Sequence, residues 1–187
     1  LGYAIDAMCD PAASPIHTAL ALQGLQRLFY ELYVSKEHPG SFLSRGSLQY
    51  RMWWMCSFSV QKGSIGLSHA LSRHVHTTYK VPQSIASCIT LPTAMRALAR
   101  KCSAALSDVA HAINKADVVI PASTVEAALM AADTVEELIR DLDLSLHQYN
   151  VDISNDDLLL SRTTPLKKVP NRSILENIHP TSFHDNA

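Results

Sequence analysis

The sequence predicts an all-α protein of seven to nine helices. Apolar residues recur at helical spacing along most of the 187-residue chain. No segment shows the two-residue alternation or the tight turns of paired strands, and no repeat of fixed period is present. The composition, 47% hydrophobic and 18% charged, suits a compact domain with a sizeable core. We expect one helical domain over residues 1–164 and a polar tail over residues 165–187, with one short helix near Ile174.

Turn and capping signals mark where the expected helices of the first half begin and end. Helical spacing places these helices over residues 1–8, 15–34, 48–60 and 65–78. Asp10 and Pro11 end the first helix, and Ser14 followed by Pro15 begins the second. A turn at residues 38–40 and a polar connection lead to the third helix, which we expect to begin only at residue 48.

The second half is expected to hold helices over residues 85–102, 103–116, 122–132 and 134–142. Pro92 lies inside the first of these and is predicted to kink or split it. Asp133 and Glu136 form a capping box that predicts a new helix after residue 133. Ser154 and Asp157 repeat this pattern before three leucines.

The segment Tyr50–Met55 (YRMWWM) is rich in aromatic residues and methionine. We interpret it as buried core, because Met and Trp at helical spacing usually pack inside a protein. The alternative is that it lines an apolar ligand pocket.

Composition excludes several classes of function. Sixteen basic and seventeen acidic residues give a net charge of −1, with no basic stripe for nucleic acid. No apolar run approaches the roughly 18–20 residues that a membrane span needs. The glycine-rich phosphate-binding motifs GxGxxG and GxxxxGK(S/T) do not occur, so this domain is not expected to bind a nucleotide alone.

The N-terminus lacks the features of a signal peptide and reads as the interior of a helix, so we infer that the chain was cut from a longer, cytoplasmic protein.

The four cysteines show no CxxC spacing. We interpret them as small buried hydrophobic residues in a reducing compartment.

Three histidines fall within eight residues of the fourth expected helix. Helical geometry places His69, Arg73 and His76 on one face and His74 on another. Arg73 carries a fixed positive charge that repels a divalent cation and favours an anion. From this pattern alone, the histidines are either surface polar residues or part of a site.

Residues 66–92 contain GLSHAL, VP and SCITLP, which resemble the central motif of the iron-dependent alcohol dehydrogenase superfamily, especially its maleylacetate reductase branch. YAIDAM near the start resembles the family's earlier metal helix. The resemblance implies the dehydroquinate synthase-like fold, with this chain as its multi-helix C-terminal domain. An N-terminal α/β domain, not in this chain, would then bind NAD(P) for hydride transfer between the nicotinamide and an alcohol or carbonyl carbon.

The resemblance also implies a metal site of one Asp and three His. The Asp position falls ahead of Leu1, and the three His positions hold Tyr3, His69 and Gln83. A phenol and a carboxamide are poor ligands for Fe²⁺ or Zn²⁺. His69 is therefore the only retained ligand, and we expect no tightly bound metal. Arg73 takes the place of a further histidine that lies near substrate in the family.

The resemblance, with these departures from it, implies an NAD(P)-dependent alcohol dehydrogenase or maleylacetate reductase-like oxidoreductase that works without a metal on a small molecule such as a keto acid. His69 would donate a proton and Arg73 would stabilise charge, while Tyr3, His76 and Gln83 would contact substrate. The expected partner is the chain's own N-terminal domain, and a homodimer is left open. The alternative is a diverged non-redox member, either a cyclase or isomerase or a scaffold. In a purely structural role, Arg73 would pair with an acidic neighbour such as Asp6.

Overall fold

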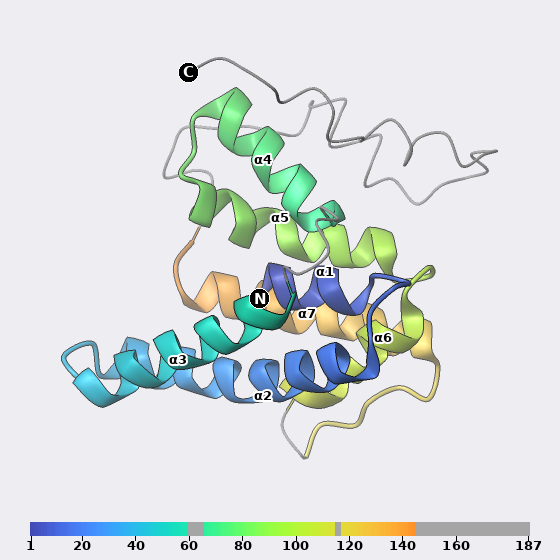
Figure 1. Cartoon of the computed structure of the whole chain (residues 1–187), viewed down its shortest axis with the longest axis horizontal. Helices are drawn as coiled ribbons and strands as arrows, with labels where there is room; N and C mark the ends of the chain where they lie inside the picture. The colour runs from blue at the N-terminus through green and yellow to red at the C-terminus, as the bar shows by residue number, and fades with distance from the viewer. Residues whose placement is uncertain (60–65, 115–116, 145–187) are drawn as a thin grey trace.

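The computed structural model describes residues 1–59, 66–114 and 117–144. These residues form seven helices and no strand (Figure 1), which confirms the all-α prediction for this part of the chain. The helices, in chain order, are α1 (Gly2–Met8), α2 (Pro15–Glu37), α3 (Phe42–Ser59), α4 (Leu67–Tyr79), α5 (Gln83–Leu98), α6 (Ser103–Ile113) and α7 (Thr124–Asp141). The helices predicted near Ser154 and Ile174 lie outside the described residues.

The short helix α1 lies at the centre of the arrangement. It contacts α2, α3, α4, α5 and α6, and it buries Ala4, Ile5 and Met8. Consecutive helices pack as pairs, α2 with α3, α4 with α5 and α6 with α7, and α5 also packs on α7. In Figure 1 the α4–α5 pair and the α2–α3 pair lie on opposite sides of α1. Side chains of α1 can therefore reach elements that are far away in the sequence.

Two clusters of buried residues hold the helices together. The larger joins α1, α2, α5, α6 and α7 around side chains such as Ile5, Leu25, Met95, Leu106 and Leu138. The smaller lies between α4 and α5 and contains Leu71, Val75, Val81, Ala86 and Ala94. Burying such side chains contributes roughly 1.5–3 kcal/mol for each large one. The smaller cluster fixes α4 on α5.

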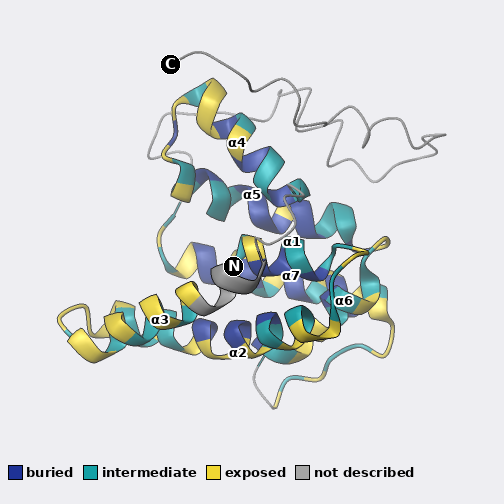
Figure 2. Ribbon diagram, viewed as in Figure 1, coloured by how far each residue is buried: buried dark blue, intermediate teal, exposed yellow. Residues whose placement is uncertain are grey.

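Many residues of α3 are exposed to solvent (Figure 2). Tyr50, Met52 and Trp53 are 50%, 56% and 62% exposed, so the interpretation of these three residues as core is wrong. The helix also begins at Phe42, six residues earlier than expected. Helix α3 packs on α2 and on α1, and its other side, which carries these three residues, faces solvent.

The second half of the chain departs from the expected boundaries for reasons of packing. Residues 124–141 form one helix, α7, and no new helix begins after Asp133. Its buried stripe runs without a break from Ala127 to Ile139. Asp133 and Glu136 accept hydrogen bonds from Arg96 of α5, at 2.7 and 2.5 Å. The two acidic residues thus link helices rather than cap one.

Pro92 does not split α5, which runs through it from Gln83 to Leu98. The neighbours Leu91, Ala94 and Met95 are all buried, so both halves of the helix are anchored in the cores. This packing offsets the loss of the hydrogen bond that proline cannot donate. The helix ends four residues earlier than expected, and α6 ends at Ile113.

One capping prediction is confirmed directly. The Ser14 hydroxyl accepts a hydrogen bond from the His17 N–H at 3.4 Å, with Pro15 in the first turn of α2.

No helix among the described residues is long and apolar enough to cross a membrane.

Candidate functional site

The site is built around the first turn of α4, where His69 lies. Gly66 is the N-cap of this helix and has no side chain to cap it. Asp6 of α1 takes that role, because its carboxylate accepts hydrogen bonds from the Ser68 N–H (3.3 Å), the Ser68 hydroxyl (2.7 Å) and the His69 N–H (3.3 Å). A carboxylate at a helix N-terminus also interacts favourably with the helix dipole. Asp6 therefore fixes His69 through the backbone.

Glycine at position 66 allows this close approach. A Cβ atom at that position would lie 2.1 Å from Cγ and 2.5 Å from Cβ of Asp6. The backbone of Gly66 has φ −68° and ψ 169°, which any residue can adopt. The requirement for glycine is thus one of space and not of backbone conformation.

Burial sets the ionisation of Asp6. It raises the pKa of this carboxyl above its ordinary 3.8, while hydrogen bonds from Ser68 and His69 and the positive charge of His69 oppose the rise. Burial disfavours the charged form and the donors favour it. The hydrogen bonds from the first turn of α4 therefore stabilise the ionised carboxylate against the effect of burial.

Tyr3 covers the His69 ring from α1. The two ring centroids are 5.3 Å apart and the rings are tilted by 33°. Tyr3 and Asp6 are three residues apart in α1, so they lie on one side of that helix. The same short helix therefore holds both the backbone and the ring of His69.

Gln83 approaches from the start of α5. Its side-chain amide donates to the Ser72 hydroxyl at 3.0 Å, and that hydroxyl donates to the His69 carbonyl oxygen, also at 3.0 Å. Ser72, in the middle of this chain of hydrogen bonds, is fully buried. Tyr3 of α1 therefore lies against the His69 ring, and Gln83 of α5 is connected through Ser72 to the His69 backbone.

The other two predicted residues lie further along α4. Arg73, one turn after His69, is exposed. His76 Nδ1 lies 2.7 Å from the Val81 carbonyl oxygen, and because a carbonyl can only accept, Nδ1 must carry the proton. His76 thus ties the end of α4 to the following turn, about 10 Å along the helix from His69.

The side chains at these three positions differ from the usual ligands of a divalent metal ion. Tyr3, His69 and Gln83 offer a phenol, an imidazole and a carboxamide. Iron and zinc sites in proteins use several imidazole, carboxylate or thiolate ligands. Within residues 1–59, 66–114 and 117–144, no three His, Cys, Asp or Glu side chains are grouped so that they could hold a metal ion.

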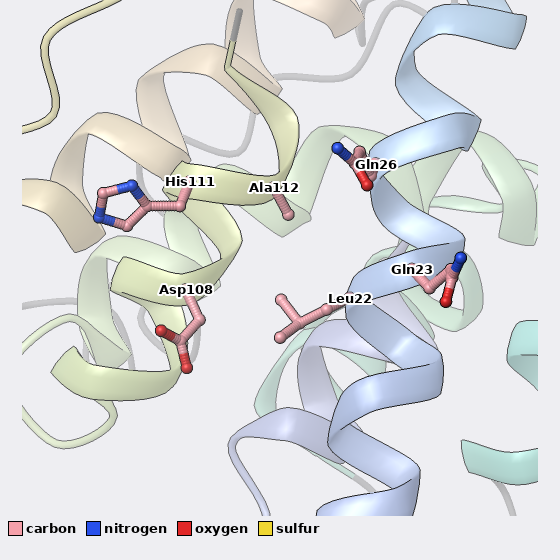
Figure 3. A pocket seen from close by; sticks show the side chains of 6 residues that line it. All are labelled: Leu22, Gln23, Gln26, Asp108, His111 and Ala112. Carbon is pink, nitrogen blue, oxygen red and sulfur yellow. The ribbon is translucent and has the colours of Figure 1, made fainter. Parts of the chain in front are cut away.

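A pocket of about 540 Å³ lies elsewhere, between α2 and α6 (Figure 3). It is lined by Leu22, Gln23, Gln26, Asp108, His111 and Ala112. In Figure 3 the His111 ring points away from the α2 side chains. None of the lining residues belongs to α1, α4 or α5, so this pocket is separate from the site around His69.

Sequence reasoning missed the residues that support the site. Ser68 and Ser72 were not singled out, and Asp6 was considered only as a partner for Arg73. An available signal was Gly66 at the start of a helix, since a glycine N-cap leaves the first amides to be satisfied by another element.

The fold and the site together define a class of protein. It is an all-helical domain in which a histidine lies in the first turn of a glycine-capped helix, and a loop with a proline and a further helix follow. The profile of the Fe-containing alcohol dehydrogenase family, C-terminal part, matches residues 1–169. The chain therefore belongs to this family, and the resemblance expected from the sequence is confirmed. Searches of curated proteins and of solved structures gave no match.

Proposed function

We propose that the chain is the substrate-side domain of an NAD(P)-dependent reductase of this family that acts on a carbonyl compound bearing a carboxylate, without a resident metal. The observation that carries the proposal is the arrangement around His69. Asp6 fixes its backbone, Tyr3 covers its ring, and Gln83 is linked to it through Ser72. Because contacts from other helices fix His69, this residue can be aligned with the reacting group of a bound substrate.

NAD(P)H would supply the hydride for this reaction. Because the chain has no glycine-rich phosphate loop, another domain would hold the nucleotide. His69 is suited to give a proton to the carbonyl oxygen as the alcohol forms, since imidazole exchanges protons near neutral pH. Arg73 would pair with the substrate carboxylate and orient the carbonyl group towards His69.

The chemistry of the donors supports the proposal that the protein holds no resident metal. In this family the metal polarises the substrate oxygen, whereas a phenol and a carboxamide next to one imidazole bind Fe²⁺ or Zn²⁺ weakly. A fixed cation at position 73 would also repel a divalent ion. Arg73 would then supply the positive charge near substrate.

Replacing Arg73 by Ala tests this proposal in the full-length protein. A charge-assisted, bidentate pair with a carboxylate contributes roughly 1.5–3 kcal/mol. We therefore expect Arg73→Ala to lower kcat/KM for an anionic keto acid by about tenfold to a hundredfold. Steady-state NAD(P)H oxidation, followed with a panel of keto acids and matched uncharged ketones, measures the effect. The loss should be confined to the anionic substrates.

His74→Ala is the matched control, because His74 contacts Tyr79 edge-on with ring centroids 6.5 Å apart and lies off the His69 face. This variant should keep its activity. If Arg73→Ala lowers the melting temperature and leaves the kinetics of the folded enzyme unchanged, Arg73 has only a structural role. If wild-type protein oxidises no NAD(P)H with any carbonyl compound, the diverged non-redox alternative is favoured.

A second prediction concerns metal content. Full-length protein purified without chelator should contain well under one equivalent of iron or zinc, because Tyr3 and Gln83 are poor ligands. Elemental analysis measures the content. The matched variant Tyr3→His/Gln83→His places two further imidazoles near His69 and should bind more of either metal. Stoichiometric metal in wild type, lost together with activity on chelation, would contradict the proposal.

A further inference from the structure

Two cysteines from distant parts of the chain meet beside the main core. Cys9 is the C-cap of α1 and Cys102 is the N-cap of α6. The Cys102 Sγ donates to the Cys9 carbonyl oxygen at 3.7 Å, and both residues pack on the larger core cluster. The two thiols are free and only half buried, so small reagents can reach them. The interpretation of these cysteines as small buried residues therefore holds only in part for this pair, which is partly buried against the core.

The two thiols differ in acidity. A hydrogen bond from the Cys9 side chain lowers the pKa of Cys102, burial raises it and the charge of Lys101 lowers it, and the net pKa is about 7. The same hydrogen bond, together with burial, raises the pKa of Cys9. The thiolate is the nucleophilic form of cysteine. Cys102 is thus the more reactive member of the pair, with Cys9 beside it as a protonated thiol.

We propose that Cys9 and Cys102 form a reversible oxidation site for a small peroxide, in which Cys102 is oxidised first and Cys9 then closes a disulfide between α1 and α6. This site is independent of the proposed reductase activity, and its test requires no substrate.

The chemistry proceeds in two balanced steps. The Cys102 thiolate attacks one oxygen of hydrogen peroxide, the O–O bond breaks, and sulfenic acid forms with release of hydroxide, which takes up a proton to become water. The Cys9 sulfur then attacks the Cys102 sulfur, the S–O bond breaks, and a second water leaves with the proton of the Cys9 thiol. The pair loses two protons and two electrons, and the peroxide is reduced to two waters.

The disulfide would connect the end of α1 to the start of α6. Helix α1 also carries Tyr3 and Asp6, which contact His69 of α4. Oxidation would therefore tether α1, the helix that positions His69. A crosslink between residues 93 positions apart restricts the unfolded chain and is expected to raise the melting temperature.

Cys88 provides an internal reference. It lies in α5, it is also a free and half-buried thiol, and burial raises its pKa. It should therefore react slowly under conditions that oxidise the pair.

The test is peptide mapping of purified protein after treatment with hydrogen peroxide and alkylation of the remaining thiols. We expect a crosslinked peptide joining Cys9 to Cys102, lighter by two hydrogens than the reduced peptides together. Dithiothreitol should abolish it, and Cys88 should remain alkylated. In Cys9→Ser, the sulfenic acid on Cys102 should be trapped by dimedone, whereas in Cys102→Ser the Cys9 thiol should stay reduced.

Other outcomes would overturn the proposal. These are equal alkylation of Cys9, Cys102 and Cys88 after peroxide, a disulfide that joins either residue to another cysteine, or dimedone labelling of Cys9 in Cys102→Ser. Cys88→Ser, which leaves the pair intact, should form the same crosslink as wild type. Circular dichroism of each variant before oxidation establishes that its helices are intact.

Discussion

Replacement of Gly66 by Ala is expected to destabilise the protein strongly. The added Cβ would lie 2.1–2.5 Å from three atoms of Asp6, including its Cβ, so a rotation of the Asp6 side chain cannot relieve the overlap. Helices α1 and α4 would have to separate, and overpacking of this kind costs about 3 kcal/mol. For a chain of this length, thermal denaturation should show a melting temperature lower by about 6–12 °C.

Gly46→Ala is the matched control. Gly46 lies inside α3, and a Cβ atom there meets nothing within 4 Å. Alanine is the better helix former, so this variant should gain about 0.5–1 kcal/mol. Because φ at Gly66 is ordinary, a Gly66→Ala variant that melts like wild type would show that α1 and α4 do not approach as closely as described.

Asp6→Ala is expected to have the second large effect. The change removes the acceptor of three hydrogen bonds from Ser68 and His69, and it leaves the first turn of α4 uncapped. Losing a cap costs about 0.5–2 kcal/mol, and each buried donor left without a partner adds to this. We expect a total loss of about 2–3 kcal/mol in the free energy of unfolding, measured by urea denaturation.

Hydrogen exchange distinguishes local from general damage in Asp6→Ala. The amides of Ser68 and His69 should exchange faster, while amides in the middle of α7 should change only as far as global stability does. Asp108→Ala, at an exposed position of α6, is the control and should stay within about 0.5 kcal/mol of wild type. If both alanine variants unfold at the same urea concentration, Asp6 does not hold α4.

Most of the helices could be predicted because their signals are local. Ser14 and Pro15 determine the start of α2 within the chain itself. Apolar spacing likewise predicts α1, α4 and α6, since each buries one face on a neighbour. The family was also visible in the sequence, because residues 66–92 carry its motif without a gap.

The errors in the second half came from competition between local and tertiary signals. Asp133 and Glu136 have the spacing of a capping box, but their carboxylates are taken by Arg96 from α5. The apolar stripe of α7 continues past them, and burying it as one helix outweighs a new N-terminus. Pro92 and, in α3, Tyr50 and Trp53 were misjudged in the same way, since burial depends on which helices lie opposite.

The sequence by itself determined the helical class, the family and the residues at the start of α4. Through the resemblance of short motifs it also predicted that Tyr3, His69 and Gln83 belong to one site. Only the tertiary structure decided what holds that site, namely Asp6 under Gly66, Ser72 between Gln83 and His69, and His76 at the far end of the helix. It also brought Cys9 to Cys102. These contacts join residues up to 93 positions apart, and no local pattern specifies such pairs, because packing of complete helices positions them.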